Sequence, residues 1–247
     1  MSDRPRTDAR AARLALERLL EADAPHLARV LPPGFADAAE AYVALLLDAN
    51  ARLNLTRVVE PEAVARLHLL DSLAALPLLD EAEATSALDR GSGGGVPGLI
   101  LAMARPGTAW TLVDSVRKKV DALRAFADAL GLTNVTVVAE RAEILGRGTT
   151  RESHDAVTAR ACAALPVLAE YALPLVRIGG SLLAWKGRIR SEELEAGEAA
   201  SALLGGGAPE LRTSVVAGHS FVLVSKVGPT PERYPRRPGL PARRPLP

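Results

Sequence analysis

The glycine-rich stretch 89–98 holds the residues whose types and spacing are best suited to binding chemistry. It reads Asp-Arg-Gly-Ser-Gly-Gly-Gly-Val-Pro-Gly and lies between a strand-like run, 85–88, and a helix-like run, 99–104. Because glycine has no Cβ, a ligand can lie against such a turn, and free N–H groups at the helix start would point at it. A second strand-like run, 110–113, ends on Asp114, where an acid can hold the two hydroxyls of a ribose. This order predicts a site for an adenosine-containing cofactor.

Two registers of the glycines indicate two different cofactors. Gly93, Gly95 and Gly98 match G-x-G-x-x-G, the pattern of dinucleotide sites. Gly91, Gly93 and Gly95 match G-x-G-x-G, the form expected for S-adenosylmethionine. The second register is favoured, because Pro97 removes one N–H from the helix start, where a pyrophosphate would bind. No G-x-x-x-x-G-K-[ST] occurs, which excludes a P-loop, and a flexible loop without a ligand is the remaining alternative.

Side chains that follow the other predicted strands extend this candidate site, because ligands of open α/β sheets bind at the carboxyl ends of the strands. Ala142 and Glu143 follow the third strand, where the edge of adenine would lie, with a solvated Glu143 as the alternative. Arg160 follows the fourth strand and would face the reactive end of the cofactor, an RNA phosphate or solvent. Lys186 ends the fifth strand and would contact an RNA phosphate or be exposed. Asp114 can hold a ribose and also cap the next helix.

His68, Asp71 and Ser72 share one face of a predicted helix, since they lie three and four residues apart. Three side chains on one helical turn cannot place a base behind a nucleophile around a carbonyl, which excludes a catalytic triad. We expect instead a polar face packed against the cofactor-binding half. No two histidines have metal-ligand spacing, so we predict no metal site. Cys162, the single cysteine, is expected to be a small buried apolar residue.

The spacing of apolar residues divides the chain into a helical first part and an alternating second part. Helical spacing occurs over 9–22, 35–50 and about 60–76. From residue 85, strands predicted at 85–89, 110–114, 134–138, 154–158 and 179–185 alternate with helices predicted at 97–104, 116–130, 163–176 and 191–203. This alternation predicts a parallel sheet covered on both faces. Strand-like runs at 211–216 and 221–227 predict an antiparallel hairpin, because the link between them is too short for a helical crossover.

These elements predict an α/β fold with a Rossmann-like, doubly wound sheet of the class I methyltransferase type. The terminal antiparallel hairpin favours this type over the all-parallel dehydrogenase sheet. We place an N-terminal helical extension at 1–80, the S-adenosylmethionine-binding domain at 81–228 and a basic tail at 229–247.

Composition indicates a globular protein with an aliphatic core. The chain has 247 residues, of which 48% are apolar and only 3% aromatic. No apolar run has the length of a membrane span, and the polar start Met-Ser-Asp-Arg lacks the apolar core of a signal peptide. We therefore expect a cytoplasmic protein without membrane contacts.

Charge is informative only at the C-terminus. The formal net charge of +1 does not by itself indicate nucleic-acid binding. The tail is rich in proline and carries one acid, Glu232, against the arginines Arg233, Arg236, Arg237, Arg243 and Arg244. Such a segment suits phosphate contact better than folding, and a solvated disordered tail is the alternative.

Taken together, these residues resemble the RsmG family, also called glucose-inhibited division protein B. The resemblance runs from about residue 54 to 246. It rests on the joint order of short segments: Asn-Leu-Thr at 54–56, His-Leu-Leu-Asp-Ser-Leu at 68–73, Val-Pro-Gly at 96–98, Leu-Val-Asp-Ser-Val-Arg-Lys-Lys at 112–119, Arg-Ala-Glu at 141–143, Ala-Arg-Ala at 159–161, Leu-Ala-Trp-Lys-Gly at 183–187 and the tail at 230–239. Two residues depart from the pattern. Arg90 stands where a small apolar residue is expected, and Gly94 where alanine is common.

The resemblance implies an S-adenosylmethionine-dependent methyltransferase that modifies N7 of a guanine in 16S (small-subunit) ribosomal RNA. Guanine N7 carries no proton, so methyl transfer to it depends on alignment, and we expect no general base and no catalytic side chain. The implied cofactor contacts fall on Gly91, Val96, Ala142, Glu143 and Arg160. Gly93 and Asp114 join them from the glycine pattern and the strand order.

The expected partner is 16S ribosomal RNA or an assembling small-subunit particle, without an obligate protein partner. The candidates for RNA contact are Arg160, Lys186, Arg236 and Arg237. Because a guanine must be unstacked to reach a pocket and few aromatic residues are available, RNA affinity should depend on basic contacts and on salt. Two alternatives remain open: an NAD-dependent oxidoreductase, from the Gly93 register, and a non-catalytic RNA-binding protein.

Overall fold

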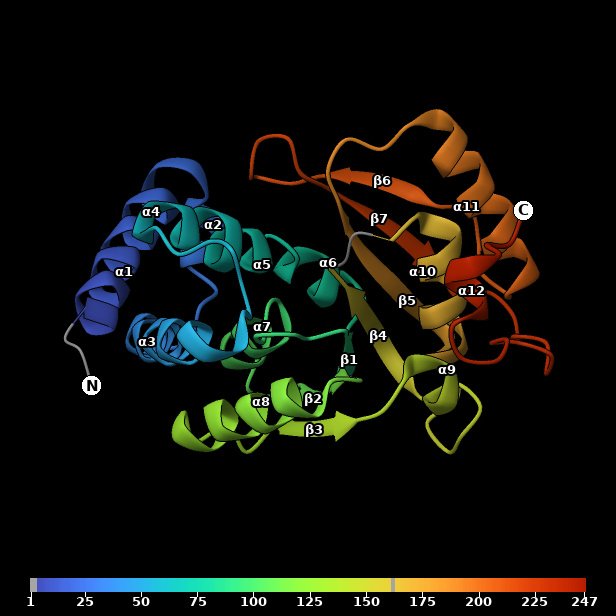
Figure 1. Cartoon of the computed structure of the whole chain (residues 1–247). Coiled ribbons are helices and arrows are strands. Elements are labelled where there is room, and N and C mark those ends of the chain that lie inside the picture. Colours follow the sequence, from blue (N-terminus) through green and yellow to red (C-terminus); the bar gives the residue numbers. More distant parts are fainter. Residues whose placement is uncertain (1–3, 161–162) are drawn as a thin grey trace.

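The chain folds around a mixed β-sheet with helices on both faces (Figure 1). The computed structural model describes residues 4–160 and 163–247. Seven strands in these ranges form one sheet in the order β3-β2-β1-β4-β5-β7-β6. They are β1 (Ser86–Arg90), β2 (Ala109–Asp114), β3 (Val135–Ala139), β4 (His154–Ala159), β5 (Val176–Lys186), β6 (Glu210–Thr213) and β7 (Ser220–Ser225).

Strand direction places the ligand-binding edge of the sheet. β1 to β5 are parallel, whereas β7 is antiparallel to both of its neighbours, β5 and β6. The predicted hairpin is confirmed, although β6 is shorter than expected; it is exposed along its length and carries Glu210 and Arg212, as suits an edge strand. The strand order reverses between β1 and β4, so their carboxyl ends form the crevice where open α/β sheets bind ligands.

One face of the sheet is covered by the N-terminal helices together with the two that follow β1 and β2. These are α1 (Arg4–Asp23), α2 (Pro25–Ala28), α3 (Phe35–Leu53), α4 (Pro61–Val64), the π-helix η1 (Ala65–Leu70), α5 (Asp71–Leu73), α6 (Leu76–Glu81), α7 (Gly98–Ala104) and α8 (Arg117–Ala129). A single buried apolar cluster joins Leu46 of α3, Leu101 of α7 and Leu112 of β2. The N-terminal helices therefore share a core with the sheet.

The helix predicted over 60–76 is not regular. A π-helical turn, Ala65–Leu70, separates α4 from α5. Its wider hydrogen-bond spacing changes the angle between successive side chains. As a result His68 bonds to Thr56, whereas Asp71 faces His219 of the hairpin loop. The polar side chains that a regular helix would align are thus divided between two sets of partners.

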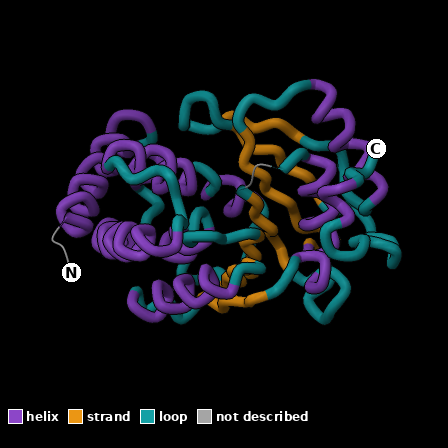
Figure 2. Tube along the Cα trace, in the orientation of Figure 1, coloured by secondary structure: helices purple, strands orange, loops and turns teal. Residues whose placement is uncertain are grey.

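The other face is covered by a second group of helices, separated from the first by the strands (Figure 2). They are α9 (Ala142–Leu145), α10 (Leu165–Ala172), the 3-10 turn η2 (Leu173–Leu175), α11 (Ser191–Leu203) and α12 (Leu240–Arg243). Their apolar core includes Leu168, Leu182 and Val224. In the described residues, no helix combines the length and the apolar character that a membrane span requires.

The C-terminal tail, residues 229–247, is packed against this second face. Tyr234 and Leu246 belong to its apolar core and are each 8% exposed. Arg147 and Arg151 donate hydrogen bonds to tail carbonyls, including those of residues 234 and 235. The prediction of a tail better suited to phosphate contact than to folding is therefore wrong on folding, because its backbone carbonyls and side chains find partners within the protein.

Candidate functional site

The glycine loop between β1 and α7 turns through three glycines with positive φ. These angles are 75° at Gly91, 56° at Gly93 and 99° at Gly95. L-residues with a Cβ disfavour this region, which explains the glycines locally. The predicted strand–glycine turn–helix order is present, with β1 ending at Arg90 and α7 beginning at Gly98.

The glycines differ in what lies next to them, and this difference separates the two registers. A Cβ on Gly91 would meet no atom within 4 Å, and one on Gly93 only a backbone oxygen at 3.8 Å. In contrast, a Cβ on Gly95 would lie 2.5 Å from Leu99, and one on Gly98 2.4 Å from Leu112. Gly91 and Gly93 therefore leave room for a ligand, whereas Gly95 and Gly98 are required for packing. This pattern fits the register that begins at Gly91.

Asp89 accepts a hydrogen bond from the first backbone amide of α7, that of Gly98. It is fully buried, and its Oδ2 accepts the N–H of Gly98 at 3.2 Å while Oδ1 accepts the hydroxyl of Thr158 at 2.8 Å. Burial raises the pKa of Asp89 to about 6. The sequence prediction that free N–H groups at this helix start point at the ligand is wrong for Gly98, since a carboxylate inside the protein already takes that donor.

Asp114 ends β2 and connects the glycine loop to the next helix. Its Oδ2 accepts the N–H of Gly93 at 3.1 Å, and its Oδ1 accepts the N–H of Val116, before α8, at 2.8 Å. The predicted capping role is wrong in its detail, because Val116 is the N-cap of α8 and no side chain caps this helix start; Asp114 instead closes the turn that leads into it. Each carboxylate oxygen can accept more than one hydrogen bond, so these two bonds leave capacity for ribose hydroxyls.

A pocket of about 280 Å³ lies at this edge of the sheet. It is lined by Arg90, Gly91, residues 113–116, Lys119, residues 140–143 and Tyr171. Four predicted cofactor residues thus meet there: Gly91, Asp114, Ala142 and Glu143. Gly93 is joined to them through Asp114, whereas Val96 packs against the apolar core and Arg160 does not line the pocket. A larger hollow of about 570 Å³ lies between α1 and α3, away from the strand ends.

Arg90 and Tyr171 are among the pocket residues that the sequence did not indicate as site residues. The Arg90 guanidinium lies 4.3 Å from the centroid of the Tyr171 ring, a cation–π contact between β1 and α10. Burial lowers the pKa of Arg90, and the carboxylates of Glu143 and Asp114 oppose this effect. The contact explains how a cation is tolerated where an apolar residue was expected. No short-range pattern could have paired the two residues.

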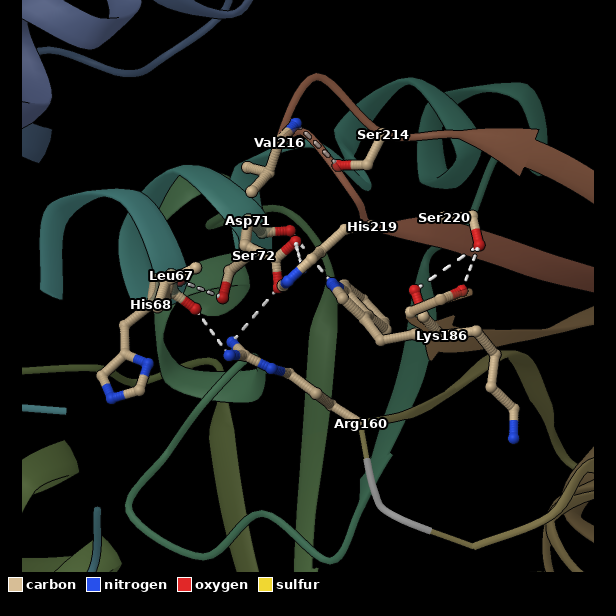
Figure 3. A network of polar contacts seen from close by, with 12 residues as sticks. Leu67, His68, Asp71, Ser72, Arg160, Lys186, Ser214, Val216, His219 and Ser220 are labelled. Atoms are coloured by element: carbon tan, nitrogen blue, oxygen red, sulfur yellow. Dashed lines mark hydrogen bonds and ion pairs between the residues drawn. The ribbon is translucent and has the colours of Figure 1, made fainter. Parts of the chain in front are cut away.

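Arg160 belongs to a polar network between the N-terminal helices and the sheet (Figure 3). Its Nη2 donates to the backbone oxygen of Leu67 at 2.5 Å, and its Nη1 lies 3.6 Å from Oδ2 of Asp71. On the other side, Oδ1 of Asp71 is 2.8 Å from Nδ1 of His219. The indole of Trp185 donates to the Asp71 backbone oxygen at 3.0 Å. Of the three residues predicted to form a polar face against the cofactor-binding half, Asp71 makes that contact, whereas His68 and Ser72 bond to residues of the N-terminal part.

His68 and Ser72 take no part in a nucleophilic arrangement. His68 Nε2 lies 2.8 Å from Oγ1 of Thr56, and the hydroxyl of Ser72 donates to the backbone oxygen of His68 at 2.6 Å. Burial, assisted by the Arg160 cation, lowers the pKa of His68 to about 4. A neutral, buried imidazole fits a structural role. Ala161 and Cys162 lie outside the described residues.

Three of the four residues expected to contact RNA are engaged within the protein, Arg160 in the network above and the other two as follows. Lys186 donates to the carbonyl of Ala163 at 2.7 Å and pairs with Glu193 at 2.6 Å, and its side chain is 10% exposed. Arg236 pairs with the buried Glu170. Arg237, in contrast, is exposed. Their contacts with RNA stay predictions.

Known proteins similar to this chain give its family. A family model described as rRNA small subunit methyltransferase G (GidB) matches residues 36–217. Ribosomal RNA small subunit methyltransferase G of Moorella thermoacetica is 42% identical over 235 residues, which are 93% of this chain and 98% of the relative. The protein of the same name from Deinococcus radiodurans is 46% identical over 209 residues, 83% of each chain.

A solved structure supports the fold. The S-adenosylmethionine-dependent O-methyltransferase of Thermotoga maritima superposes with a TM-score of 0.52 at 16% identity, covering 76% of this chain and 73% of the other. The predicted class I, Rossmann-like α/β fold is confirmed. Family match and identity over most of the length agree, and the chain belongs to the rRNA small subunit methyltransferase G (GidB) family.

Proposed function

We propose that this protein transfers the methyl group of S-adenosylmethionine to N7 of a guanine in 16S ribosomal RNA. The observation that carries the proposal is the pocket at the carboxyl ends of β1 and β2. It combines a glycine turn open to a ligand at Gly91 with the carboxylate of Asp114. Membership of a family named for small-subunit ribosomal RNA methylation supports the substrate class.

The residues of the pocket fit S-adenosylmethionine. The turn at Gly91 and Gly93 would accept the amino-acid side of the cofactor, Asp114 its ribose, and Ala142 with Glu143 its adenine. When bound, the cofactor supplies a methyl group on a sulfonium, which makes that methyl electrophilic. The NAD alternative is less well supported, because Gly95, the glycine that would face a pyrophosphate in that register, is closed by packing, and the Gly98 amide is bonded to Asp89.

The protein's own contribution to the reaction is positional. Guanine N7 presents a lone pair in the plane of the base and needs no deprotonation. Holding N7 in line with the methyl group at contact distance converts a bimolecular reaction into an effectively unimolecular one. The buried acids near the pocket have structural partners: Asp89 bonds to Gly98 and Thr158, and Asp114 to Gly93 and Val116. This assignment agrees with a reaction that uses no general base.

Methyl transfer to defined RNA substrates tests the proposal. The protein is mixed with labelled S-adenosylmethionine and either naked 16S RNA or small-subunit particles, both from cells that lack this modification. Label on a guanine N7, located by strand cleavage specific for 7-methylguanine, is the expected result, and the two substrates separate naked RNA from the assembling particle. Label on another atom, or no label with either substrate across salt and magnesium concentrations, would overturn the proposal. Calorimetry with S-adenosylhomocysteine and with NAD decides between the two cofactor classes.

A further inference from the structure

The C-terminal tail reaches the pocket wall at Glu143. Glu143 lies in the first turn of α9, lines the pocket and is 4% exposed. Its Oε1 accepts the backbone N–H of Gly239 at 2.8 Å. Within residues 4–160 and 163–247, no hydrogen bond reaches its second oxygen, Oε2. One oxygen of this pocket carboxylate is therefore held by the tail, and the other remains an unused acceptor.

A buried ion pair fastens the tail close to this contact. The side chain of Glu170, on α10, is 0% exposed and is paired with Arg236. Arg236 donates to it from the backbone N at 2.8 Å, from Nε at 2.8 Å and 3.0 Å, and from Nη2 at 2.5 Å. A buried carboxylate without its partner is strongly destabilising, so α10 and the tail depend on each other.

Two arginines that follow α9 also bond to the tail. Arg147 Nε donates to the carbonyl of Pro235 at 2.7 Å, and Arg151 Nη1 donates to that of Tyr234 at 2.8 Å. Both arginines follow α9, the helix that carries Glu143. Glu170 lies on α10, directly before the pocket residue Tyr171. The tail thus connects the two helices that form this wall of the pocket.

We propose that the C-terminal tail is a working part of the cofactor site: Gly239, held in place by the Arg236–Glu170 pair, orients Glu143 so that Oε2 accepts a hydrogen bond from the 6-amino group of adenine. Arg236 and Gly239 are positioning residues, and Glu143 selects the base. A purine with an oxygen at C6 would place a lone pair against this carboxylate and bind less well. The inference rests on the proposed function, because it takes adenine to lie beside Glu143.

The ratio of two ligand affinities tests this positioning role. S-adenosylhomocysteine and S-inosylhomocysteine differ at C6 of the purine, an amino group against an oxygen, with the matching change in protonation at N1. A general loss of stability weakens both ligands alike, whereas a misoriented Glu143 reduces the preference between them. We expect the wild-type protein to bind the adenosine compound at least about tenfold more tightly, as a hydrogen bond to a charged group allows.

The key variant is Arg236→Ala in the full chain. Calorimetry measures its affinity for the two ligands, and a thermal unfolding curve shows whether it is folded. We expect its affinity for S-adenosylhomocysteine to fall about tenfold and its preference for that ligand to fall at least about threefold. Arg243→Ala is the matched control, since Arg243 is exposed on the same tail, and it should keep the wild-type preference. If Arg236→Ala fails to fold, Glu170→Met together with Arg236→Met removes the pair without leaving a buried charge and is judged by the same ratio.

The inference would be overturned if a folded variant without the Arg236–Glu170 pair kept the wild-type preference for S-adenosylhomocysteine over S-inosylhomocysteine. A loss of RNA affinity in Arg236→Ala without a change for either nucleoside would also overturn it, because the arginine would then act on RNA. These outcomes leave the proposed function intact. Failure of the wild-type protein to bind S-adenosylhomocysteine would instead remove the proposed function itself.

Discussion

Oδ1 of Asp71 lies 2.8 Å from Nδ1 of His219, and 148 residues of chain separate the two. Asp71 belongs to α5, and His219 to the loop between β6 and β7. The other carboxylate oxygen of Asp71 lies 3.6 Å from Arg160, which follows β4. One buried acid therefore connects the N-terminal helices, the end of a central strand and the terminal hairpin (Figure 3).

Asp71→Ala should lower the free energy of unfolding by about 3 kcal/mol, because it leaves the largely buried Arg160 cation without its partner. The comparison variant is Asp80→Ala, which breaks an ion pair with Arg105 in which the Asp80 side chain is 51% exposed. Solvent screens such a pair, so its loss should cost less than about 1 kcal/mol. Urea unfolding at pH 7 measures both variants. Equal losses would show that the Asp71 network adds nothing beyond a surface ion pair.

Gly91→Ala should weaken binding of S-adenosylhomocysteine at least about tenfold, because the added Cβ enters the space left for the ligand. Its cost in stability should be about 1 kcal/mol, the strain of a positive φ at alanine. Gly131→Ala is a matched control: Gly131 has a φ of 65° and, like Gly91, open space at its Cβ, but it lies after α8 and outside the pocket. Similar unfolding curves with different affinities are expected; equal affinities would place the ligand elsewhere.

Short-range patterns predicted the order of strands and helices from β1 to β5 and the glycine turn. They succeed because apolar periodicity and glycine act through near neighbours in the chain. The placement of Asp114, which ends β2, and of Glu143, which follows β3, came from the rule that parallel strands deliver their carboxyl ends to one edge of the sheet. These residues do line one pocket, so the core of the candidate site was accessible from the sequence.

The remaining features depend on contacts between distant residues. Arg236 was expected to face phosphate, yet it meets Glu170, which is 66 residues away, because a buried carboxylate on α10 needs a cation. The amide of Gly98 was expected to face a ligand, yet Asp89 reaches it across the turn. The π-helical turn at 65–70 has no signature in apolar spacing alone. In each case tertiary packing determines the partner or the helix type, and the local sequence does not distinguish between the alternatives.

Stability should fall as the pH is lowered from about 7 to 4, in part because of His68. Its pKa in the folded protein is lowered from 6.5 to about 4 by burial. In the interval between these values the unfolded chain binds a proton that the folded protein does not, so acid favours unfolding. This group should contribute about 3 kcal/mol across the interval.

His68→Gln should flatten this pH dependence of the unfolding free energy, measured in urea at half-unit steps. His26→Gln, at an exposed position of α2, should leave the curve as in wild type. Asp89 acts in the opposite direction, since burial raises its pKa to about 6 and its contribution to stability is lost as pH rises through that value. An unchanged slope in His68→Gln would mean that the pKa of His68 does not differ between the folded and the unfolded protein.

Substitution of Arg237 distinguishes a role of the tail in RNA binding from its role in cofactor binding. It is exposed and lies two residues before Gly239, whose amide bonds to the pocket residue Glu143. If it neutralises one phosphate, Arg237→Gln should reduce the slope of log affinity for 16S RNA against log salt by about 0.7 to 0.9. Affinity for S-adenosylhomocysteine should not change. Arg10→Gln, exposed on α1, is the control and should keep the wild-type slope. The loss of a phosphate contact reduces the number of counterions that are released on binding. An unchanged slope in Arg237→Gln would therefore place the RNA away from the tail.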